Sequence, residues 1–351
     1  MRSLLARCYG AAATARRSYY ASHPSRQTRQ AHPVISIGNL TVGGSGKTPL
    51  VAEVARLLQA QGERPCILTR GYGRVDTTQS ITIVSTGAGV LEGVERSGDE
   101  PLWLARALPG VPVIVGADRV HSGRVAASRF DVSVLLLDDG FQHLRLHRDV
   151  DVLLVRPDDL TEQVLPAGRL REPLGAARVA DAVVVPTDSD TEARAAAEHL
   201  GVSNVFRMAT TLGPPVRCRT TTDRGLPAVS EMTVGGTDVP TTARVCAVAG
   251  IARPTRFFDD LRRQGWHVVS TMAFRDHHPF TQRDVTRIVA EARSCDADWI
   301  LTTEKDAVRL ERVQLTGVPC AAVPLRTTVH PADVFAAWLR TQLAAARSGQ
   351  P

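Results

Sequence analysis

The sequence predicts an α/β fold, a mostly parallel sheet covered by helices with a second, smaller α/β domain after it. Two observations predict this fold. Short β-branched strands alternate with amphipathic helices up to about residue 210, and a similar series resumes at about residue 245. Such alternation is typical of parallel sheets, because helices make the crossover connections. We expect a first domain over 33–210, a connector rich in Thr, Pro and Gly over 211–244, and a second domain over 245–351.

A glycine-rich turn between the first strand and the first helix predicts a phosphate-binding P-loop. Val34 to Ile37 form the strand, Lys47 is expected to reach the β- and γ-phosphates of a nucleotide, and the Thr48 hydroxyl to bind Mg²⁺. Thr41 stands where the general pattern has glycine, but the strand, the Gly-Lys-Thr and the helix together favour nucleotide binding. The first domain is therefore predicted to be P-loop NTPase-like. The candidate nucleotide-binding residues are Thr41, Val42, Gly43, Gly44, Ser45, Gly46, Lys47 and Thr48.

Acidic residues follow or precede the elements expected beside this turn. The strand Val132 to Leu137 ends in Asp138 and Asp139, and a carboxylate at this place commonly holds Mg²⁺ opposite the threonine hydroxyl. The sequence does not choose between the two aspartates. Asp99 and Glu100 stand at the start of a helix, where they are suited both to capping and to catalysis. We count Glu100 with Thr48 and the two aspartates as a candidate magnesium ligand.

Three further stretches carry candidate site residues. Arg70 follows a strand and is suited to clamping a phosphate or to an ordinary surface position. Arg171 and Glu172 lie in a loop that either lines an acceptor site or is simply solvated. In the loop from Phe274 to Phe280, one aspartate and the adjacent His277 and His278 form an Asp/His element that we expect to face the first domain.

Composition restricts the class of protein. The net charge is +6, from 42 basic and 36 acidic residues, and among the basic residues only Lys47 and Lys305 are lysines. This mild excess suits an anionic substrate or membrane face.

The six cysteines show no CxxC pair, which predicts a reducing compartment and no structural zinc. In Thr303 to Asp306 the Lys and Asp are adjacent, a spacing that disfavours a guanine-specific site.

Residues 1–32 differ from the rest of the chain. They contain six arginines, no Asp or Glu, and an apolar run from Leu4 to Ala15 that is too short to span a bilayer. A disordered leader, a transit peptide and an amphipathic segment on an anionic membrane surface are the three interpretations. Arginine richness is general in this chain, which weakens the transit-peptide interpretation. On composition we expect the membrane-surface segment.

Seven motifs occur in one order and together resemble the tetraacyldisaccharide 4′-kinase family, the lipid A kinases. The resemblance covers roughly residues 33–340. The N-terminal segment is shorter and richer in arginine than the hydrophobic helix that family members often carry. The motifs are Gly38-Asn-x-Thr-x-Gly-Gly-x-Gly-Lys-Thr-Pro49, Arg70-Gly-Tyr-Gly73, Gly98-Asp-Glu-Pro101, Asp138-Asp-Gly-Phe-Gln-His143, Gly168-Arg-Leu-Arg-Glu-Pro173, Phe274-x-Asp-His-His-x-Phe280 and Thr302-Thr-Glu-Lys-Asp306.

The resemblance implies Mg²⁺-dependent transfer of the ATP γ-phosphate to the 4′-hydroxyl of a tetraacyldisaccharide 1-phosphate, which gives the 1,4′-bisphosphate lipid IVA. It implies ATP and Mg²⁺ as cofactors, a lipid substrate, and a peripheral or monotopic location on the cytoplasmic face of the inner membrane. Neither nucleic acid nor a protein partner is implied. By its place in the motif, Asp99 resembles the family's base, which accepts the hydroxyl proton, and His277 resembles the residue that assists it. Lys47 is the third catalytic residue. The implied substrate-binding residues are Arg70, Tyr72, His143, Arg171 and Glu172.

Two other functions remain open at the level of sequence. One is a P-loop kinase or ligase for a soluble small molecule. The other is a nucleotide-switched binding protein that docks on membranes through residues 1–32 without catalysis. Because His277 belongs to the predicted second domain, the kinase hypothesis further predicts that closure of the two domains completes the site.

Overall fold

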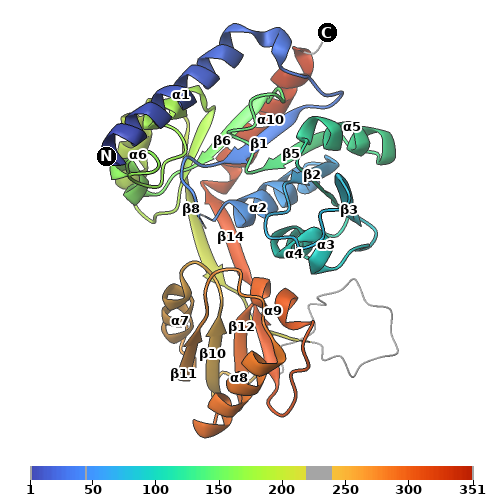
Figure 1. The fold of residues 1–351 in the computed structure, drawn as a ribbon, viewed down its shortest axis with the longest axis vertical. Coiled ribbons are helices and arrows are strands. Elements are labelled where there is room, and N and C mark those ends of the chain that lie inside the picture. Colours follow the sequence, from blue (N-terminus) through green and yellow to red (C-terminus); the bar gives the residue numbers. More distant parts are fainter. Residues whose placement is uncertain (1, 44–45, 219–238, 350–351) are drawn as a thin grey trace.

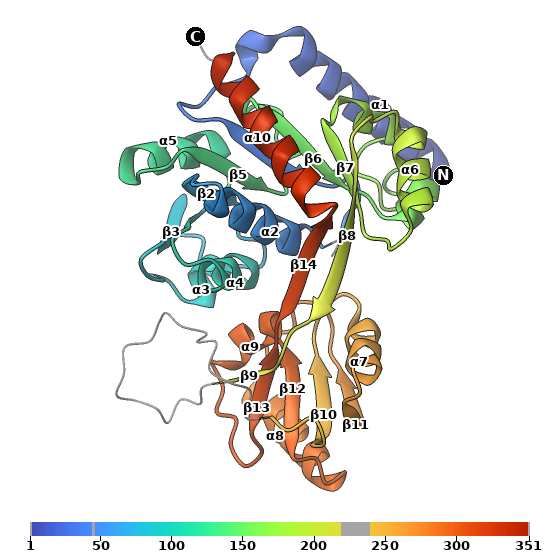
Figure 2. The same ribbon diagram turned by 180° about the vertical axis from the view of Figure 1, so that it is seen from behind.

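Two sheets organise the chain (Figures 1 and 2) in the computed structural model, which describes residues 2–43, 46–218 and 239–349. We call the larger sheet with its helices the large unit. Its neighbouring strands are parallel except at the two edges, where β3 and β14 are antiparallel to their neighbours. In spatial order the strands are β14 (Leu325–His330), β8 (Val205–Leu212), β7 (Ala182–Val185), β6 (Val150–Leu154), β1 (Val34–Gly38), β5 (Val134–Asp138), β2 (Pro65–Thr69), β4 (Pro112–Gly116) and β3 (Ile81–Thr86).

Helices cover both faces of the large sheet, because alternate strand residues point to opposite sides. Ile35 and Ile37 of β1 belong to a core that includes α2 (Lys47–Ala60), α4 (Asp99–Ala107) and α10 (Ala332–Ser348). On the opposite face, Val34 packs in a core with α5 (Arg119–Arg129), and a neighbouring core includes α6 (Asp190–Leu200). The short helix α3 (Val94–Ser97) and the 3₁₀ helices η1 (Pro24–Arg26), η2 (Pro157–Thr161) and η3 (Leu174–Val179) lie in the connections.

The second sheet with its helices forms the small unit. Its strands, in spatial order, are β11 (His267–Ala273), β10 (Arg244–Ala249), β12 (Trp299–Thr303), β13 (Cys320–Val323) and β9 (Val216–Arg217). Apolar residues of α7 (Pro254–Arg263) pack on one face and those of α8 (Gln282–Ser294) on the other. The helix α9 (Glu304–Leu310) follows β12 directly and lies beside α4 of the large unit (Figure 1).

The predicted α/β, P-loop NTPase-like fold class is confirmed, but the end of the chain differs from the expected second domain at 245–351. β14 pairs with β8 in the large sheet, and α10 returns to the face covered by α2 (Figure 2). The physical reason is apolar burial, since Phe335 and Leu339 of α10 are fully buried there, each worth about 1.5–3 kcal/mol. Of the predicted connector at 211–244, residues 211–212 end β8, β9 joins the small sheet, and 219–238 lie outside the described residues.

The segment predicted to lie on a membrane surface contains helix α1 (Arg2–Ser22), which packs along the large unit. Ala6 and Gly10 are its buried residues, whereas Leu4 and Leu5 are exposed. A Cβ atom on Gly10 would lie 3.5 Å from the Pro173 ring, so the helix backbone runs close to the loop that follows Arg171. Over the described residues, no helix has the length and apolar character needed to span a bilayer.

Candidate active site

The phosphate turn connects β1 to α2 at the carboxyl end of β1, on the side of the sheet where the parallel strands end. Gly43 and Gly46 have φ values of +98° and +96°, a left-handed conformation that glycine adopts without steric cost. Gly46 is the N-cap of α2, so Lys47 and Thr48 begin the helix. The N-terminal N–H groups of a helix attract anions. The turn therefore provides the geometry expected of a phosphate site, with Gly44 and Ser45 outside the described residues.

Lys47 is held by two polar partners in the large unit. Its Nζ lies 3.0 Å from Asn39 Oδ1 and 3.3 Å from Asp139 Oδ1. Asn39 is fully buried, and its amide donates to the Thr41 hydroxyl at 3.0 Å. Thr41 is 2% exposed and does not line the cavity, so at this position the side chain supports Asn39. This contact gives a structural reason for threonine where the general motif has glycine.

The two aspartates after β5 point in different directions. Asp139 has φ +56°, and its carboxylate accepts from Arg171 at 2.7 Å and faces Lys47. Burial alone would raise the pKa of Asp139, but these two cations outweigh it and lower the pKa. Asp138 accepts from the Thr69 hydroxyl at 3.2 Å, while its other oxygen is buried without a partner in the described part of the chain.

The surroundings of Asp138 favour a bound cation. Burial, followed by the charges of Glu100 and Asp139, raises the pKa of Asp138. A buried carboxylate with an unsatisfied oxygen is costly unless a cation balances it. Across residues 2–43, 46–218 and 239–349, no three His, Cys, Asp or Glu side chains gather into a metal site of their own. Mg²⁺ in kinases needs only one or two carboxylates, because phosphates and water complete its shell, so Thr48, Asp138 and Glu100 fit a magnesium site.

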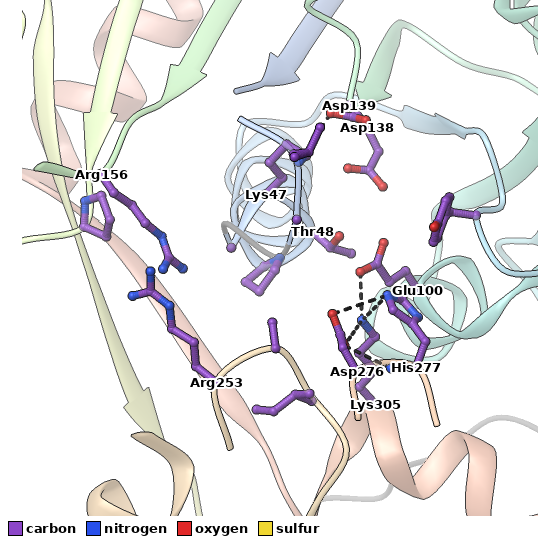
Figure 3. Close-up of a pocket in the computed structure, with 18 of the residues that line it drawn as sticks. Lys47, Thr48, Glu100, Asp138, Asp139, Arg156, Arg253, Asp276, His277 and Lys305 are labelled. Atoms are coloured by element: carbon purple, nitrogen blue, oxygen red, sulfur yellow. Dashed lines mark hydrogen bonds and ion pairs between the residues drawn. The ribbon is translucent and has the colours of Figure 1, made fainter. Parts of the chain in front are cut away.

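A second polar cluster joins the two units. Asp99 begins α4 of the large unit, and His277 lies in the small-unit loop between β11 and α8. The His277 Nδ1 lies 2.9 Å from Asp99 Oδ2 and 3.1 Å from Oδ1. Lys305 of α9 approaches the same ring, with Nζ 3.2 Å from Nε2, and also lies 3.0 Å from Glu100 Oε1. Figure 3 shows Glu100, Asp276, His277 and Lys305 together, beside Lys47 and Thr48.

Opposite charges keep Asp99 and Lys305 ionised despite their burial. Burial alone would raise the pKa of Asp99, but the hydrogen bond from His277 and the charges of Lys305 and Arg309 lower it. For Lys305, burial alone would lower the pKa, and the charges of Glu100, Asp99 and Asp276 outweigh it and raise the pKa. The Asp99 carboxylate and the Lys305 ammonium are therefore both charged near neutral pH.

The structure distinguishes the two adjacent histidines of the Asp/His element. His277 has φ +56°, an uncommon conformation for a bulky residue, and its ring lines the cavity. The His278 ring faces its own loop instead, with Nε2 3.1 Å from Asp284 Oδ2. Of the two, His277 is the histidine in contact with Asp99.

One cavity of about 1200 Å³ connects the phosphate turn with this cluster. It is lined by residues of both units and of α1. Asp99, which is 4% exposed, is not among the lining residues and lies behind His277. The residues predicted from the sequence that line it are Val42, Gly43, Gly46, Lys47, Thr48, Arg70, Tyr72, Glu100, Asp138, Asp139, Arg171, Glu172 and His277.

One predicted substrate residue is not brought to the cavity. His143 is not among the lining residues, and its Nε2 is buried without a partner in the part of the chain that the structure describes. Burial and the charge of Arg119 lower the pKa of His143 to about 4, so its ring is neutral near pH 7. The motif Asp138 to His143 thus contributes Asp138, Asp139 and Gln142 to the cavity wall, whereas His143 does not line it.

Several cavity residues are absent from the sequence-based candidates. They include Lys305 and Asp276 in the cluster, Arg156 and Arg253 on the other side of the phosphate turn (Figure 3), and Tyr9 and Arg16 of α1. Lys305 carried one signal in the sequence, as one of two lysines in a chain that otherwise uses arginine. Asp276 carried a signal as the aspartate of the predicted Asp/His element. Arg156 and Arg253 carried none, because nothing in their spacing separates them from surface residues.

Three comparisons with known proteins find similarity to the same kind of kinase. A family profile described as "Tetraacyldisaccharide-1-P 4'-kinase" matches residues 2–344. The chain is 42% identical over 301 residues to a tetraacyldisaccharide 4'-kinase of Geobacter metallireducens, covering 83% of this chain and 82% of that protein. It is 39% identical over 336 residues to one of Koribacter versatilis, covering 94% of each. The crystal structure of LpxK from Aquifex aeolicus in complex with ATP superposes with a TM-score of 0.74 at 29% identity, covering 97% of each chain.

Proposed function

The chain belongs to the tetraacyldisaccharide 4′-kinase family, and we propose that its large unit holds ATP while its small unit completes the proton acceptor. The resemblance of the seven motifs is thereby confirmed: the protein is an ATP-dependent kinase of lipid A biosynthesis, with a lipid acceptor. The reaction we assign to the site is transfer of the ATP γ-phosphate to the 4′-hydroxyl of a tetraacyldisaccharide 1-phosphate. The observation that carries the assignment is the contact of Asp99 with His277 beside the phosphate turn.

The phosphate turn binds the triphosphate in this proposal. Lys47 contacts the β- and γ-phosphates, and the N–H groups at the start of α2 face the same anion. Asn39 and Asp139 hold Lys47 beforehand, so little reorganisation is needed when negative charge moves to the transferring group. Arg171 neutralises Asp139 from the other side, which leaves the charge of Lys47 available to the phosphates.

Thr48, Asp138 and Glu100 are the residues proposed to hold Mg²⁺. Each aspartate has one buried oxygen without a hydrogen-bond partner in the described residues. Asp139 is nevertheless paired with Lys47 at 3.3 Å and Arg171 at 2.7 Å, which supports Asp138 as the metal ligand. A Mg²⁺ ion held by these three residues would neutralise charge that develops during transfer. Their side chains would orient the cation, and the burial of Asp138 excludes bulk water from its carboxylate.

The acceptor hydroxyl gives up its proton to the Asp99–His277 pair. The O–H bond breaks as the oxygen bonds to the γ-phosphorus, and the bond from that phosphorus to the β–γ bridging oxygen breaks to release ADP. Asp99 acts as the base through His277, which takes the hydroxyl proton at Nε2 and shares its Nδ1 proton with Asp99 across their 2.9 Å contact. Because Asp99 is 4% exposed and His277 lines the cavity, the hydroxyl approaches the pair from the side of the imidazole.

The remaining part of the cavity accommodates the disaccharide and its membrane. Arg70, Tyr72, Arg171 and Glu172 line the wall proposed to contact the sugar and its phosphate. Helix α1 forms another part of that wall, while Leu4 and other apolar residues on it are exposed. We place this helix on the cytoplasmic face of the inner membrane, in peripheral or monotopic attachment, from which the acyl chains reach the cavity.

Transfer of labelled γ-phosphate from ATP to a purified tetraacyldisaccharide 1-phosphate in detergent micelles tests the proposed function, with and without Mg²⁺. A doubly phosphorylated lipid that forms only with Mg²⁺ is the expected result. Label transferred equally well in the presence of excess EDTA would remove the metal from the mechanism. If ATP binds and the lipid stays unlabelled, while a soluble sugar acceptor is labelled, the assignment of the acceptor is wrong.

A further inference from the structure

Lys305 stands out from the other basic residues of the chain by its type and by its place. It is one of two lysines, and the other, Lys47, is accounted for by the phosphate turn. It belongs to the small unit, at the start of α9, yet its side chain lines the shared cavity and is only 22% exposed. A buried ammonium at a unit boundary requires a reason beyond solubility.

Its partners come from both units. The Lys305 ammonium lies 3.0 Å from Glu100 Oε1 of the large unit and 3.2 Å from His277 Nε2 of the small unit. Carboxylate oxygens of Asp276 and Asp99 follow at 3.8 Å and 3.9 Å. Three carboxylates thus surround the cation, and a ring nitrogen is one of its two nearest neighbours.

The contact with His277 has a chemical consequence. An ammonium has hydrogens to donate and no lone pair, so the Nε2 atom that it meets must accept. Nε2 then carries no hydrogen, so the ring hydrogen is on Nδ1 and is donated to Asp99. Contacts on both edges of the ring therefore define its tautomer and its orientation, in a residue whose φ of +56° is already unusual.

We propose that Lys305 is a positioning residue for phosphoryl transfer: its ammonium, itself held by Glu100, holds the imidazole of His277 against Asp99 with Nε2 directed to the cavity. This inference rests on the proposed function, in which the Asp99–His277 pair accepts the proton. When the acceptor hydroxyl enters, it replaces the ammonium at Nε2. Glu100 and Asp276 keep the displaced Lys305 close by.

Lysine rather than arginine is required by this geometry. An ammonium is a compact point charge with three donors directed away from one nitrogen, and it can meet Glu100 and His277 at once. Guanidinium is planar, larger and built for paired acceptors. In a chain that otherwise uses arginine for its positive charges, a position that needs the smaller cation is where lysine is expected to persist.

A purely structural role for Lys305 is the competing explanation, because α9 meets the large unit at other charged contacts as well. Arg106 of α4 donates to both oxygens of Glu311, at 2.5 and 2.7 Å, on the exposed part of the same boundary. Arg106→Met removes one positive charge and one ion pair between the same two helical regions without touching the cavity. It is therefore the matched control for Lys305→Met.

The test compares kcat, KM for ATP and KM for the lipid in Lys305→Met, Lys305→Arg and Arg106→Met. We expect both Lys305 variants to lower kcat by about 10–100-fold, the range typical of residues that orient a reacting group, with KM for ATP almost unchanged. Arg106→Met should keep kcat within about twofold, as exposed ion pairs contribute little. Equal losses in Arg106→Met and Lys305→Met, or wild-type kcat in Lys305→Arg, would overturn the proposal.

Chemical rescue separates loss of the ammonium from damage to the fold. Lys305→Cys treated with 2-bromoethylamine regains a side chain of nearly lysine length that ends in an ammonium. Treated wild-type protein is the control, because Cys8 is also exposed. Recovery of most of the lost kcat supports the proposal, and recovery of stability without kcat contradicts it. A wild-type kcat in Asp99→Asn would instead refute the assignment of the Asp99–His277 pair as proton acceptor, whatever the Lys305 variants show.

Discussion

The phosphate turn and the Asp99–His277 pair face the same cavity, but the chain builds them in different ways. The turn is local: its strand, glycines, lysine and threonine are contiguous over about 15 residues, and its supports, Asn39 and Asp139, directly follow the neighbouring strands β1 and β5. The pair joins residues 178 positions apart, one from each unit. Its geometry therefore depends on how α9 and the loop before α8 meet α4.

This difference predicts how each half responds to substitution. A change in the turn alters the binding of ATP in the ground state and also charge stabilisation in the transition state. A change in the pair acts on a proton that moves only during transfer, so it lowers kcat and leaves ATP affinity nearly constant. The two regions can therefore be separated by measuring affinity and turnover in the same variants.

Lys47→Ala is expected to give the largest loss in kcat/KM. It removes a charge that contacts the phosphates before and during transfer, so kcat should fall about 10²–10³-fold, as when one preorganised donor is lost. In addition, ATP affinity should fall roughly tenfold, as expected for the loss of a charge-assisted contact. Steady-state kinetics together with calorimetric titration of a non-hydrolysable ATP analogue measure both effects.

Arg56→Ala on the exposed side of the same helix is the control for this prediction. It removes an equal charge from α2 at a site 44% exposed, where its nearest acid, Glu53, is 4.0 Å away. Both its affinity and its turnover should match the wild type. Normal turnover in Lys47→Ala would refute the assignment of the phosphate turn.

Asp99→Asn should lower kcat by about 10²–10⁴-fold, the range for loss of a general base. Affinity for the ATP analogue should stay within about twofold, because Asp99 lies behind His277 and does not line the cavity. The double variant Asp99→Asn with His277→Asn should lose little more than either single variant, since the two groups act as a unit. A collapse of ATP affinity in Asp99→Asn would instead make it a metal or structural residue.

Asp138→Asn should raise the Mg²⁺ concentration for half-maximal rate by roughly 10-fold or more, the range for lost metal-site interactions. Asp139→Asn is the matched comparison, because asparagine tolerates the φ of +56° found there. It should leave the Mg²⁺ requirement nearly unchanged and affect the rate through Lys47 and Arg171. If the two variants exchange these behaviours, Asp139 is the magnesium ligand.

The sequence predicted the local half of the site better than the assembled half. Lys47, Thr48 and the acids after β5 were predictable because strand, turn and helix follow each other directly, and parallel strands end at one edge. The choice of His277 over His278 was not predictable from the residues, because adjacent histidines differ only in the direction of their side chains. That direction depends on the backbone, which has a φ of +56° at His277. Lys305 depends on α9 meeting α4 across 200 residues, which no local pattern encodes.

The fold shows the same limit. The alternation of strands and helices predicted the parallel sheet, since each crossover is a local unit. The return of β14 and α10 to the large sheet was missed, because β14 pairs with β8 from more than 100 residues earlier. His143 illustrates a related limit: it does not line the cavity although its motif does, and spacing alone does not separate the cavity-lining residues of a motif from the others.

Arg17→Ala is expected to have the smallest effect on catalysis, although it tests how α1 joins the large unit. Arg17 donates to both oxygens of Glu172 at 2.6 and 2.9 Å, with side chains 12% and 5% exposed, and its guanidinium lies over the Phe141 ring. Removal leaves a buried carboxylate unpaired, so Tm should fall. Because α1 lines only the acceptor side of the cavity, KM for the lipid should rise roughly fivefold, about 1 kcal/mol, with kcat and KM for ATP unchanged.

Two variants decide whether this effect comes from the buried pair. Arg7→Ala removes the same charge from an exposed position on α1, so stability should change by less than about 0.5 kcal/mol. Adding Glu172→Gln to Arg17→Ala should recover much of the lost Tm, because removing both partners leaves no buried charge unpaired. If Arg17→Ala lowered kcat as much as Asp99→Asn, α1 would contribute to the chemistry itself, and the division between a binding region and a proton-transfer region would fail.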